Sequence, residues 1–322
     1  MVAEQKIWER PIKSVGVIGL TGVGRAICQR LARDGQPFGI DHVAAYDAEA
    51  SALGESADTE VVVASSIADL VDMVDLVLLC LPGPGDVGRI ARSHEGLLDC
   101  VREGQIIVDH GWSSFDLTRQ LATAFSARNA AFLDAPIGNA ATVEQAIDLG
   151  KLAFSIGGDT AATEAVLPLL GCFAGDITHV GAAGAAQVVR QVGDLVTLQT
   201  FAALGEGLMT AQAFGVEEDR LFDALAKGNG EGFGIGRHGP SGSNGGDAAA
   251  AQQTSIAEAG RRLGEAIQLA KGKNLSLTGA DSTMILLEKA MENGIGEKDL
   301  SGLFGAMKAE IEQAERPGRP RG

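Results

Sequence analysis

Short apolar runs alternate with amphipathic segments in the first half of the chain. The expected strands are Val15–Ile18, Val43–Tyr46, Leu76–Cys80, Ile106–Val108, Phe132–Leu133, Leu152–Ile156 and Ile177–Val180. Runs that are apolar throughout are typical of strands buried on both faces of a parallel sheet. Ser66, three residues before Asp69, resembles a capping box, and Asp159 can cap a helix that ends at Leu170. This alternation predicts a doubly wound α/β domain.

The pattern becomes helical after about Gly181. Ala185 to Ala213 contains no proline and carries an apolar stripe, which predicts one long helix. The stripe consists of Val188, Val192, Leu195, Val196 and Phe201. Further helices are expected at about 217–227, 250–271, 281–293 and 297–313. The sequence therefore predicts two domains, residues 1–182 with the sheet and residues 183–322 built of helices alone.

A glycine-rich segment, Gly228–Gly246, interrupts these helices with nine glycines in nineteen residues. A loop of this length is usually either functional or disordered. Two interpretations stay open: a lid that carries Arg237 and His238 over a site, or an exposed loop.

The turn after the first expected strand is typical of a dinucleotide site. Its residues are Gly19, Leu20, Thr21, Gly22, Val23 and Gly24, and a helix follows. Such glycines let the backbone approach a pyrophosphate, and the helix N-terminus offers it N–H groups. Asp47 ends the second strand, where a carboxylate binds the ribose 2′-OH and repels a 2′-phosphate. We expect NAD rather than NADP; alternatively, the turn only packs helix on strand.

The charge and composition of the chain disfavour several classes of binding partner. Lys and Arg number 26 against 42 Asp and Glu, a net charge of −16, which disfavours nucleic acid and anionic membranes. The four cysteines include no C-x-x-C pair, and no cluster has metal-ligand spacing. The first residues contain no signal-like apolar run, and no stretch is apolar enough to span a membrane. We expect a cytoplasmic protein with a small-molecule substrate and no metal.

Five segments, in order, resemble the β-hydroxyacid dehydrogenase family, which includes 3-hydroxyisobutyrate dehydrogenase and 6-phosphogluconate dehydrogenase. VGVIGLTGVGRAICQRLA is similar to the family's G-L-G-x-M-G-x-x-M-A, and LLCLPGPGDV to its C-L-P loop. IIVDHGWSSFDLTRQLA stands where the family has V-D-x-S-T-x-x-P. FLDAPIGNAATVEQAIDLGKLAFSIGG resembles D-A-P-V-S-G-G with G-T-L and V-G-G, and VGAAGAAQVVRQVGDL resembles the start of the interdomain helix.

This resemblance implies a Rossmann-type domain followed by an all-helical domain across a long helix. It also implies a homodimer or homotetramer. The binding residues it suggests are Leu81, Pro82 and Trp112 for the cofactor and Gly138, Asn139 and Ala140 for the substrate. Alternatively, Trp112 flanks the substrate or is a core or interface residue. His238 in the glycine-rich segment is a further substrate candidate.

The sequence departs from the family's pattern at positions that the resemblance places in the active site. Gly111-Trp112 replaces a Ser-Thr pair, and Arg190 stands where the family carries its catalytic lysine. An arginine can clamp a carboxylate or polarise a carbonyl, but it cannot move a proton. Asp194 lies one turn further along the helix, so it is either the proton carrier or the partner of Arg190 in a structural ion pair. His110, at the end of a strand, is either a second proton carrier or a turn residue satisfied by backbone.

Three functional hypotheses follow. The first is an NAD-dependent dehydrogenase or reductase acting on a hydroxy or carbonyl compound other than the family's usual hydroxyacids. The second is an enzyme similar to the imine reductases, which share the architecture and lack the lysine. The third is a dinucleotide-binding protein that has lost catalysis.

Overall fold

The computed structural model describes Trp8 and residues 11–20, 22–49, 61–138, 143–227, 254–300 and 302–303. Its contacts divide the chain into two units. The first comprises residues 1–139 with 143–190, and the second comprises residues 140–142 with 191–322. The expected separation between residues 182 and 183 stays a prediction.

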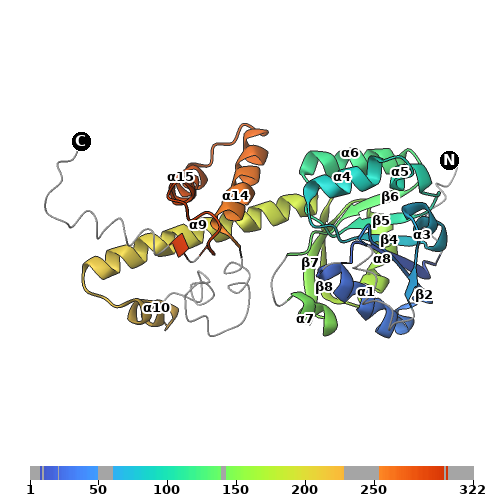
Figure 1. The fold of residues 1–322 in the computed structure, drawn as a ribbon, viewed down its shortest axis with the longest axis horizontal. Coiled ribbons are helices and arrows are strands. Elements are labelled where there is room, and N and C mark those ends of the chain that lie inside the picture. Colours follow the sequence, from blue (N-terminus) through green and yellow to red (C-terminus); the bar gives the residue numbers. More distant parts are fainter. Residues whose placement is uncertain are drawn as a thin grey trace. The chain divides into compact units, whose positions relative to one another are not determined.

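One sheet of eight strands forms the centre of the first unit, in the order β3-β2-β1-β4-β5-β6-β7-β8 (Figure 1). Its strands are β1 (Ser14–Ile18), β2 (His42–Tyr46), β3 (Val61–Val63), β4 (Leu76–Leu79), β5 (Ile106–Asp109), β6 (Ala131–Asp134), β7 (Leu152–Gly157) and β8 (Ala174–Gly181). Neighbours from β3 through β6 are parallel, β7 is antiparallel to β6, and β8 is parallel to β7. The predicted α/β class and all seven predicted strands are confirmed; β3 was not predicted.

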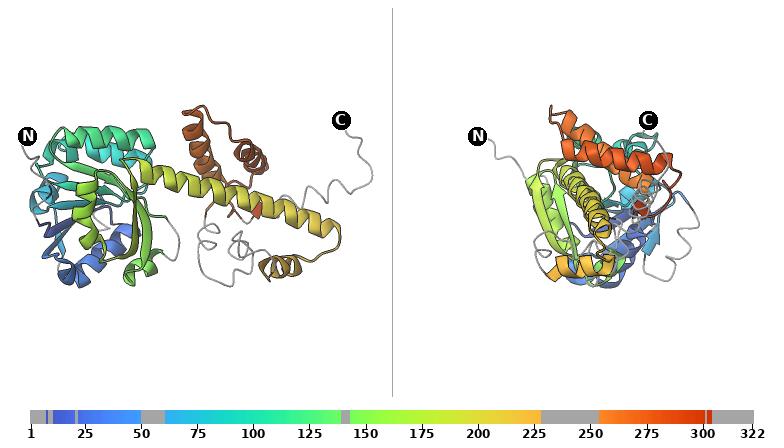
Figure 2. Two further views of the ribbon diagram at one scale, coloured as in Figure 1. Left: turned by 180° about the vertical axis from the view of Figure 1, so that it is seen from behind. Right: turned by 90° about the vertical axis from the view of Figure 1, so that its left-hand side faces the viewer.

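Helices connect these strands and cover both faces of the sheet. They are α1 (Val23–Asp34), η1 (Gln36–Phe38), α3 (Ile67–Met73), α4 (Pro84–Arg92), α5 (Leu97–Cys100), α6 (Phe115–Ser126), α7 (Val143–Asp148) and α8 (Thr160–Leu170). Helices α4, α5 and α6 lie on one side and α1 on the other (Figures 1 and 2). The predicted caps are confirmed, because Ser66 Oγ accepts the Asp69 N–H at 3.1 Å and Asp159 Oδ1 accepts the Ala162 N–H at 2.8 Å.

β8 differs from its prediction. Its apolar run suggested a strand buried on both faces, but the strand ends the sheet and most of its residues are exposed or half-buried. An edge strand has one neighbour, so it needs less apolar surface than a central strand such as β4, which is buried along its whole length.

The described part of the second unit is helical. The long helix α9 (Ala185–Ala213) has the predicted bounds and continues from the first unit into the second. The other helices are α10 (Glu218–Lys227), α14 (Ile256–Lys271) and α15 (Thr278–Glu292). Leu198 and Phe201 of α9 share a buried core with Leu263 of α14 and Leu287 of α15. Most of the helix expected at 297–313 and the whole of Gly228–Gly246 lie outside the described residues.

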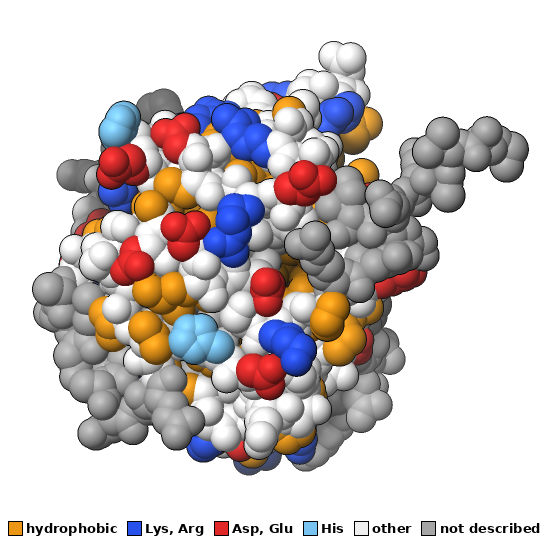
Figure 3. Space-filling view, turned by 90° about the vertical axis from the view of Figure 1, so that its right-hand side faces the viewer, with side chains coloured by type: hydrophobic (Ala, Val, Ile, Leu, Met, Phe, Trp, Pro, Cys, Tyr) orange, Lys and Arg blue, Asp and Glu red, His pale blue; other side chains and the backbone are white. Residues whose placement is uncertain are grey.

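On the face drawn in Figure 3, acidic and basic side chains are interspersed. None of the helices in the described ranges combines the length and apolarity that a bilayer crossing requires. In the same ranges, no three His, Cys, Asp or Glu side chains gather in a way that could hold a metal ion.

Candidate functional site

The turn between β1 and α1 depends on glycine at two positions. Gly19 has φ +94°, and its N–H donates to the Tyr46 carbonyl oxygen at 3.0 Å. A Cβ atom on Gly24 would lie 1.9 Å from the Gly19 carbonyl oxygen. Helix α1 begins at Val23 with Gly22 as its N-cap and no side-chain cap. The backbone of the turn is therefore closely packed in front of a helix N-terminus. Thr21 lies outside the described residues.

Asp47 is fixed beside this turn. Its Oδ2 accepts the Leu20 N–H at 2.7 Å, and its Oδ1 accepts the Glu49 N–H at 2.9 Å. Each carboxylate oxygen retains a second acceptor site. Arg25, in the first turn of α1, donates its Nε–H to the Leu20 carbonyl oxygen at 3.2 Å. A half-buried carboxylate thus lies where β1 and β2 end.

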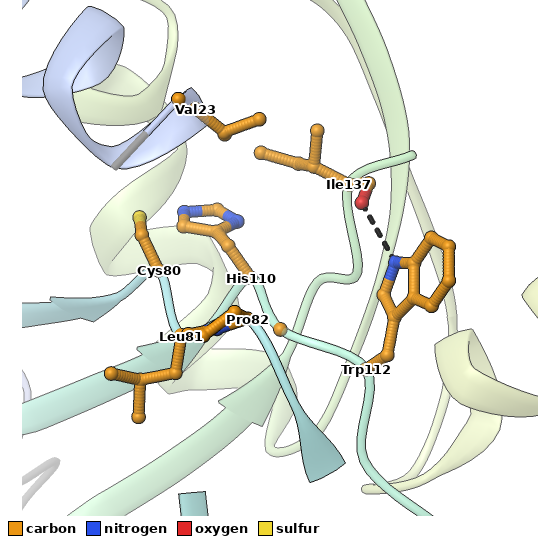
Figure 4. Close-up of a pocket in the computed structure, with 9 residues that line it drawn as sticks. Val23, Cys80, Leu81, Pro82, His110, Trp112 and Ile137 are labelled. Atoms are coloured by element: carbon orange, nitrogen blue, oxygen red, sulfur yellow. Dashed lines mark hydrogen bonds between the residues drawn. The ribbon is translucent and has the colours of Figure 1, made fainter. Parts of the chain in front are cut away.

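A cavity of about 280 Å³ opens at the carboxyl ends of β1, β4, β5 and β6 (Figure 4). It is lined by Gly22, Val23, Cys80, Leu81, Pro82, His110, Gly111, Trp112 and Ile137. β1 and β4 are neighbours, and the chain order reverses between them. Open α/β sheets bind ligands at this kind of switch point.

The end of β5 holds two buried ionisable groups in sequence. Asp109 accepts the Gly111 N–H at 2.8 Å and the Ser113 hydroxyl at 2.7 Å, and its burial raises its pKa to about 6. The Nδ1 of His110 lies 2.8 Å from the Ala135 carbonyl oxygen, a geometry that assigns the proton to Nδ1. Burial lowers the pKa of His110 to about 4. Its Nε2 is buried without a hydrogen-bond partner, so His110 is a neutral imidazole with an unsatisfied acceptor.

The first turn of α9 is anchored on β6. Asp134 Oδ1 accepts the Gly184 N–H at 2.7 Å, and Oδ2 accepts the Gln187 N–H at 3.0 Å. The side chain of Gln187 donates to the Gly111 carbonyl oxygen at 3.0 Å. Gln187 is fully buried, so it connects the start of the helix to the wall of the cavity.

Arg190 lies one turn further along α9. Its guanidinium carbon is 4.9 Å from the centroid of the Trp112 ring, within the range of a cation–π contact. Its Nε–H donates to Gln187 Oε1 at 3.4 Å. The Trp112 ring is itself held by a 2.9 Å hydrogen bond from Nε1 to the Ile137 carbonyl oxygen (Figure 4). Arg190 is therefore held against an aromatic side chain of the cavity.

Two other predicted site residues, Asp194 and Gly138, are not among the described residues that line this cavity. Asp194 is buried and forms an ion pair with Arg262 of α14. Gly138 is exposed, and a Cβ atom there would meet nothing within 4 Å. Asn139, Ala140 and His238 lie outside the described residues.

Three members of this arrangement were missed by the sequence analysis. Cys80 and Ile137 line the cavity, yet an apolar residue after a strand carries no sequence signal of its own. Gln187 stands three positions before Arg190, so it shares the helix face of that residue. That spacing was the available signal for Gln187.

Comparison with known proteins agrees with this geometry. The sequence model of a family described as the NAD binding domain of 6-phosphogluconate dehydrogenase matches residues 14–181, just over half of the chain. The 2-(hydroxymethyl)glutarate dehydrogenase of Eubacterium barkeri is 25% identical over 299 residues, which cover 92% of this chain and 95% of that protein. An uncharacterized oxidoreductase of Shewanella frigidimarina is 29% identical over 155 residues, 48% of this chain and about half (52%) of that protein.

Solved structures share the fold. A 3-hydroxyisobutyrate dehydrogenase of Mycobacterium tuberculosis, solved with L-serine, has a TM-score of 0.78 at 22% identity, covering 92% of this chain and 99% of that chain. A variant imine reductase of Myxococcus stipitatus in complex with NAD+ has a TM-score of 0.60 at 17% identity, with the same two coverages. At these identities the likeness concerns the fold alone.

Proposed function

Because the chain belongs to the β-hydroxyacid dehydrogenase family, we propose that it is an NAD-dependent oxidoreductase acting on a hydroxy or carbonyl compound. The observation that carries this proposal is the cavity at the β1/β4 switch point, bordered by a glycine turn and an uncapped helix N-terminus. Such a site suits a dinucleotide whose phosphates need N–H donors and close backbone approach.

The residues present fit the cofactor. Gly22 lines the cavity with φ +50°, a conformation that favours glycine, so backbone rather than a side chain faces the cavity at the N-cap of α1. Gly19, Leu20, Gly22, Val23 and Gly24 would hold the diphosphate. The nicotinamide half would lie against Leu81, Pro82 and Trp112, which line the same cavity. Thr21 completes the proposed turn.

Asp47 supports a preference for NAD over NADP. Its carboxylate lies beside the turn and has acceptor capacity for a ribose 2′-OH, whereas a 2′-phosphate would meet a like charge. Arg25 is the nearby cation that could weaken this discrimination, since it contacts the carbonyl of the residue that Asp47 binds. We propose that repulsion of a 2′-phosphate by the Asp47 carboxylate outweighs its attraction to Arg25, so that NAD is preferred.

The cofactor, when bound, accepts or donates the hydride; the chain's own residues orient the substrate. Arg190, held on Trp112, would clamp or polarise a substrate oxygen, because an arginine stays charged throughout. His110 would accept a hydrogen bond at Nε2 from an O–H or N–H donor, since its low pKa leaves that nitrogen unprotonated at neutral pH. Asp194 pairs with Arg262, and we propose an electrostatic role for it.

The substrate is proposed to differ from that of the named dehydrogenases. Gly111 and Trp112 stand in place of a Ser-Thr pair, and the indole ring fills part of the cavity wall. Gly138, Asn139, Ala140 and His238 stay candidate substrate contacts.

Calorimetric titration tests the cofactor assignment. We expect the wild-type protein to bind NADH at least tenfold more tightly than NADPH. Asp47→Asn should reduce this ratio severalfold, while Asp72→Asn, which removes an exposed acid on α3, should leave it unchanged. Absence of NADH binding, or tighter binding of NADPH, would contradict the proposal. Turnover would then be sought with a panel of other hydroxy and carbonyl compounds, with 3-hydroxyisobutyrate, 2-(hydroxymethyl)glutarate and a cyclic imine included for comparison.

A dinucleotide-binding protein without catalysis is the second candidate. It is favoured by the state of the candidate proton carriers: Asp194 is ion-paired and His110 is buried and neutral. Tight NADH binding without oxidation or reduction of any compound in this panel would support this candidate over the first.

A further inference from the structure

An acidic side chain lies at the entrance of the proposed diphosphate site. It belongs to the short helix α7, which lies against α1 (Figure 1). Val143 and Ile147 of α7 are buried, and Asp148 forms a 2.7 Å ion pair with Arg33 near the end of α1. These contacts hold α7 along α1, with Glu144 in its first turn.

Glu144 extends toward the N-terminus of α1. A Cβ atom added to Gly22, the N-cap of α1, would lie 3.7 Å from Glu144 Oε1. The N-cap makes no side-chain hydrogen bond, and the first turn of α1 contains no acidic residue. A carboxylate beside this positive end of the helix dipole is electrostatically favourable in the ligand-free protein.

The same position borders the cavity. Gly22 and Val23 line it, and so does His110, whose buried Nε2 has no hydrogen-bond partner. The orphaned nitrogen and the uncapped helix end are independent signs that a ligand completes this site. A ligand diphosphate at the helix N-terminus would lie next to the Glu144 carboxylate, and two negative charges would then be in close proximity.

We propose that Glu144 competes with the cofactor diphosphate for the N-terminus of α1, and that it weakens binding and accelerates release of the dinucleotide. This proposal rests on the proposed function, because it requires a dinucleotide in the cavity. Glu144 is exposed, so the repulsion is screened by solvent and salt. The expected cost to affinity is about threefold to tenfold at low ionic strength. Faster release matters where product dissociation limits turnover.

Glu144→Gln removes the charge and keeps the size of the side chain. We expect the variant to bind NADH and ADP about threefold to tenfold more tightly than wild type at low salt, with a lower dissociation rate in stopped-flow displacement. Adenosine, which lacks the diphosphate, should bind both proteins equally. Glu164→Gln, which removes an exposed acid on α8, is the matched control and should change none of these values.

The outcomes separate this inference from the proposed function. If wild type binds NADH but Glu144→Gln binds it equally or more weakly, the competition is contradicted while the dinucleotide site stands. An equal gain for adenosine would also contradict it, since the effect would not depend on phosphate. If wild type binds neither NADH nor ADP, the proposed function is contradicted, and the inference that rests on it is contradicted with it. Circular dichroism of each variant checks that the fold is retained.

Discussion

Asp109 and His110 are consecutive buried residues, and burial disfavours the charged form of each side chain. Burial raises the pKa of Asp109 to about 6 and lowers that of His110 to about 4. In the unfolded chain the corresponding values are about 3.9 and 6.5. The Asp109 contribution to stability is therefore present at low pH and lost as pH rises through 6. The His110 contribution is present above pH 6.5 and lost as pH falls through 4. Between about pH 4 and 6 the two contributions oppose each other.

Asp109→Asn should reveal the contribution of His110. Without the carboxyl group, the free energy of unfolding should fall more steeply than in wild type as the pH is lowered from 6.5 to 4.5. The difference in slope has an upper limit of about 1.4 kcal/mol per pH unit, the value for one proton. Urea denaturation at a series of pH values measures it.

His110→Phe is the opposite control for the same experiment. The aromatic rings of Phe154 and Phe173 already surround this position, so a phenyl ring can pack there. Relative to wild type, this variant should gain stability as the pH falls through the same range. The exposed Asp72→Asn should follow the wild-type profile. Parallel profiles for all four proteins would show that neither buried group carries the expected contribution.

The residues that the sequence identified around the cavity are those whose signal is local. The glycine turn is recognised by its spacing behind a strand, and Asp47 by its distance along the chain from that turn. The only local signal for Gln187 was its spacing from Arg190 on α9, whereas Ile137 reaches the site through packing of the segment after β6, which no local pattern encodes. The ion pair of Asp194 with Arg262 was missed for the same reason.

At the scale of elements, the capping residues predicted where two helices begin. The direction and exposure of the strands were harder to predict. Ser66 and Asp159 cap helices as expected, because an N-cap involves residues two or three apart. β3 was missed because it has three residues, too few for a periodicity. The direction of β7 and the exposure of β8 depend on which neighbour each strand meets, and that is decided by the whole sheet.

Helix α9 begins on the carboxylate of Asp134, and this anchor should be energetically important. Asp134→Ala would leave the N–H groups of Gly184 and Gln187 without their acceptor in a buried place. We expect a loss of about 3 kcal/mol in the free energy of unfolding, measured by urea denaturation.

Asp159→Ala provides the comparison for this loss. It removes an N-cap from α8, where the hydrogen bond is only partly buried, and should cost about 1 kcal/mol. Asp134→Asn, which keeps one acceptor oxygen, should fall between wild type and Asp134→Ala. Equal losses for the two alanine variants would mean that burial adds nothing to the α9 anchor.

The whole molecule carries a net charge of −16, and its proposed cofactor is also an anion. Long-range attraction therefore cannot bring the two together. The helix N-terminus attracts phosphate only over short distances, since the effect of a helix dipole falls off within a turn. At low ionic strength the protein's overall field should instead slow the approach of the ligand.

The association rate constant of NADH should consequently increase with salt. Raising the ionic strength from 10 to 150 mM shortens the Debye length from about 30 Å to about 8 Å, so repulsion by distant carboxylates is screened while the contacts in the site persist. We expect a rise of about two- to fivefold, measured by stopped-flow fluorescence, and no change for uncharged adenosine. A decrease with salt would mean that local positive potential around the α1 N-terminus governs the encounter, despite the acidic character of the chain.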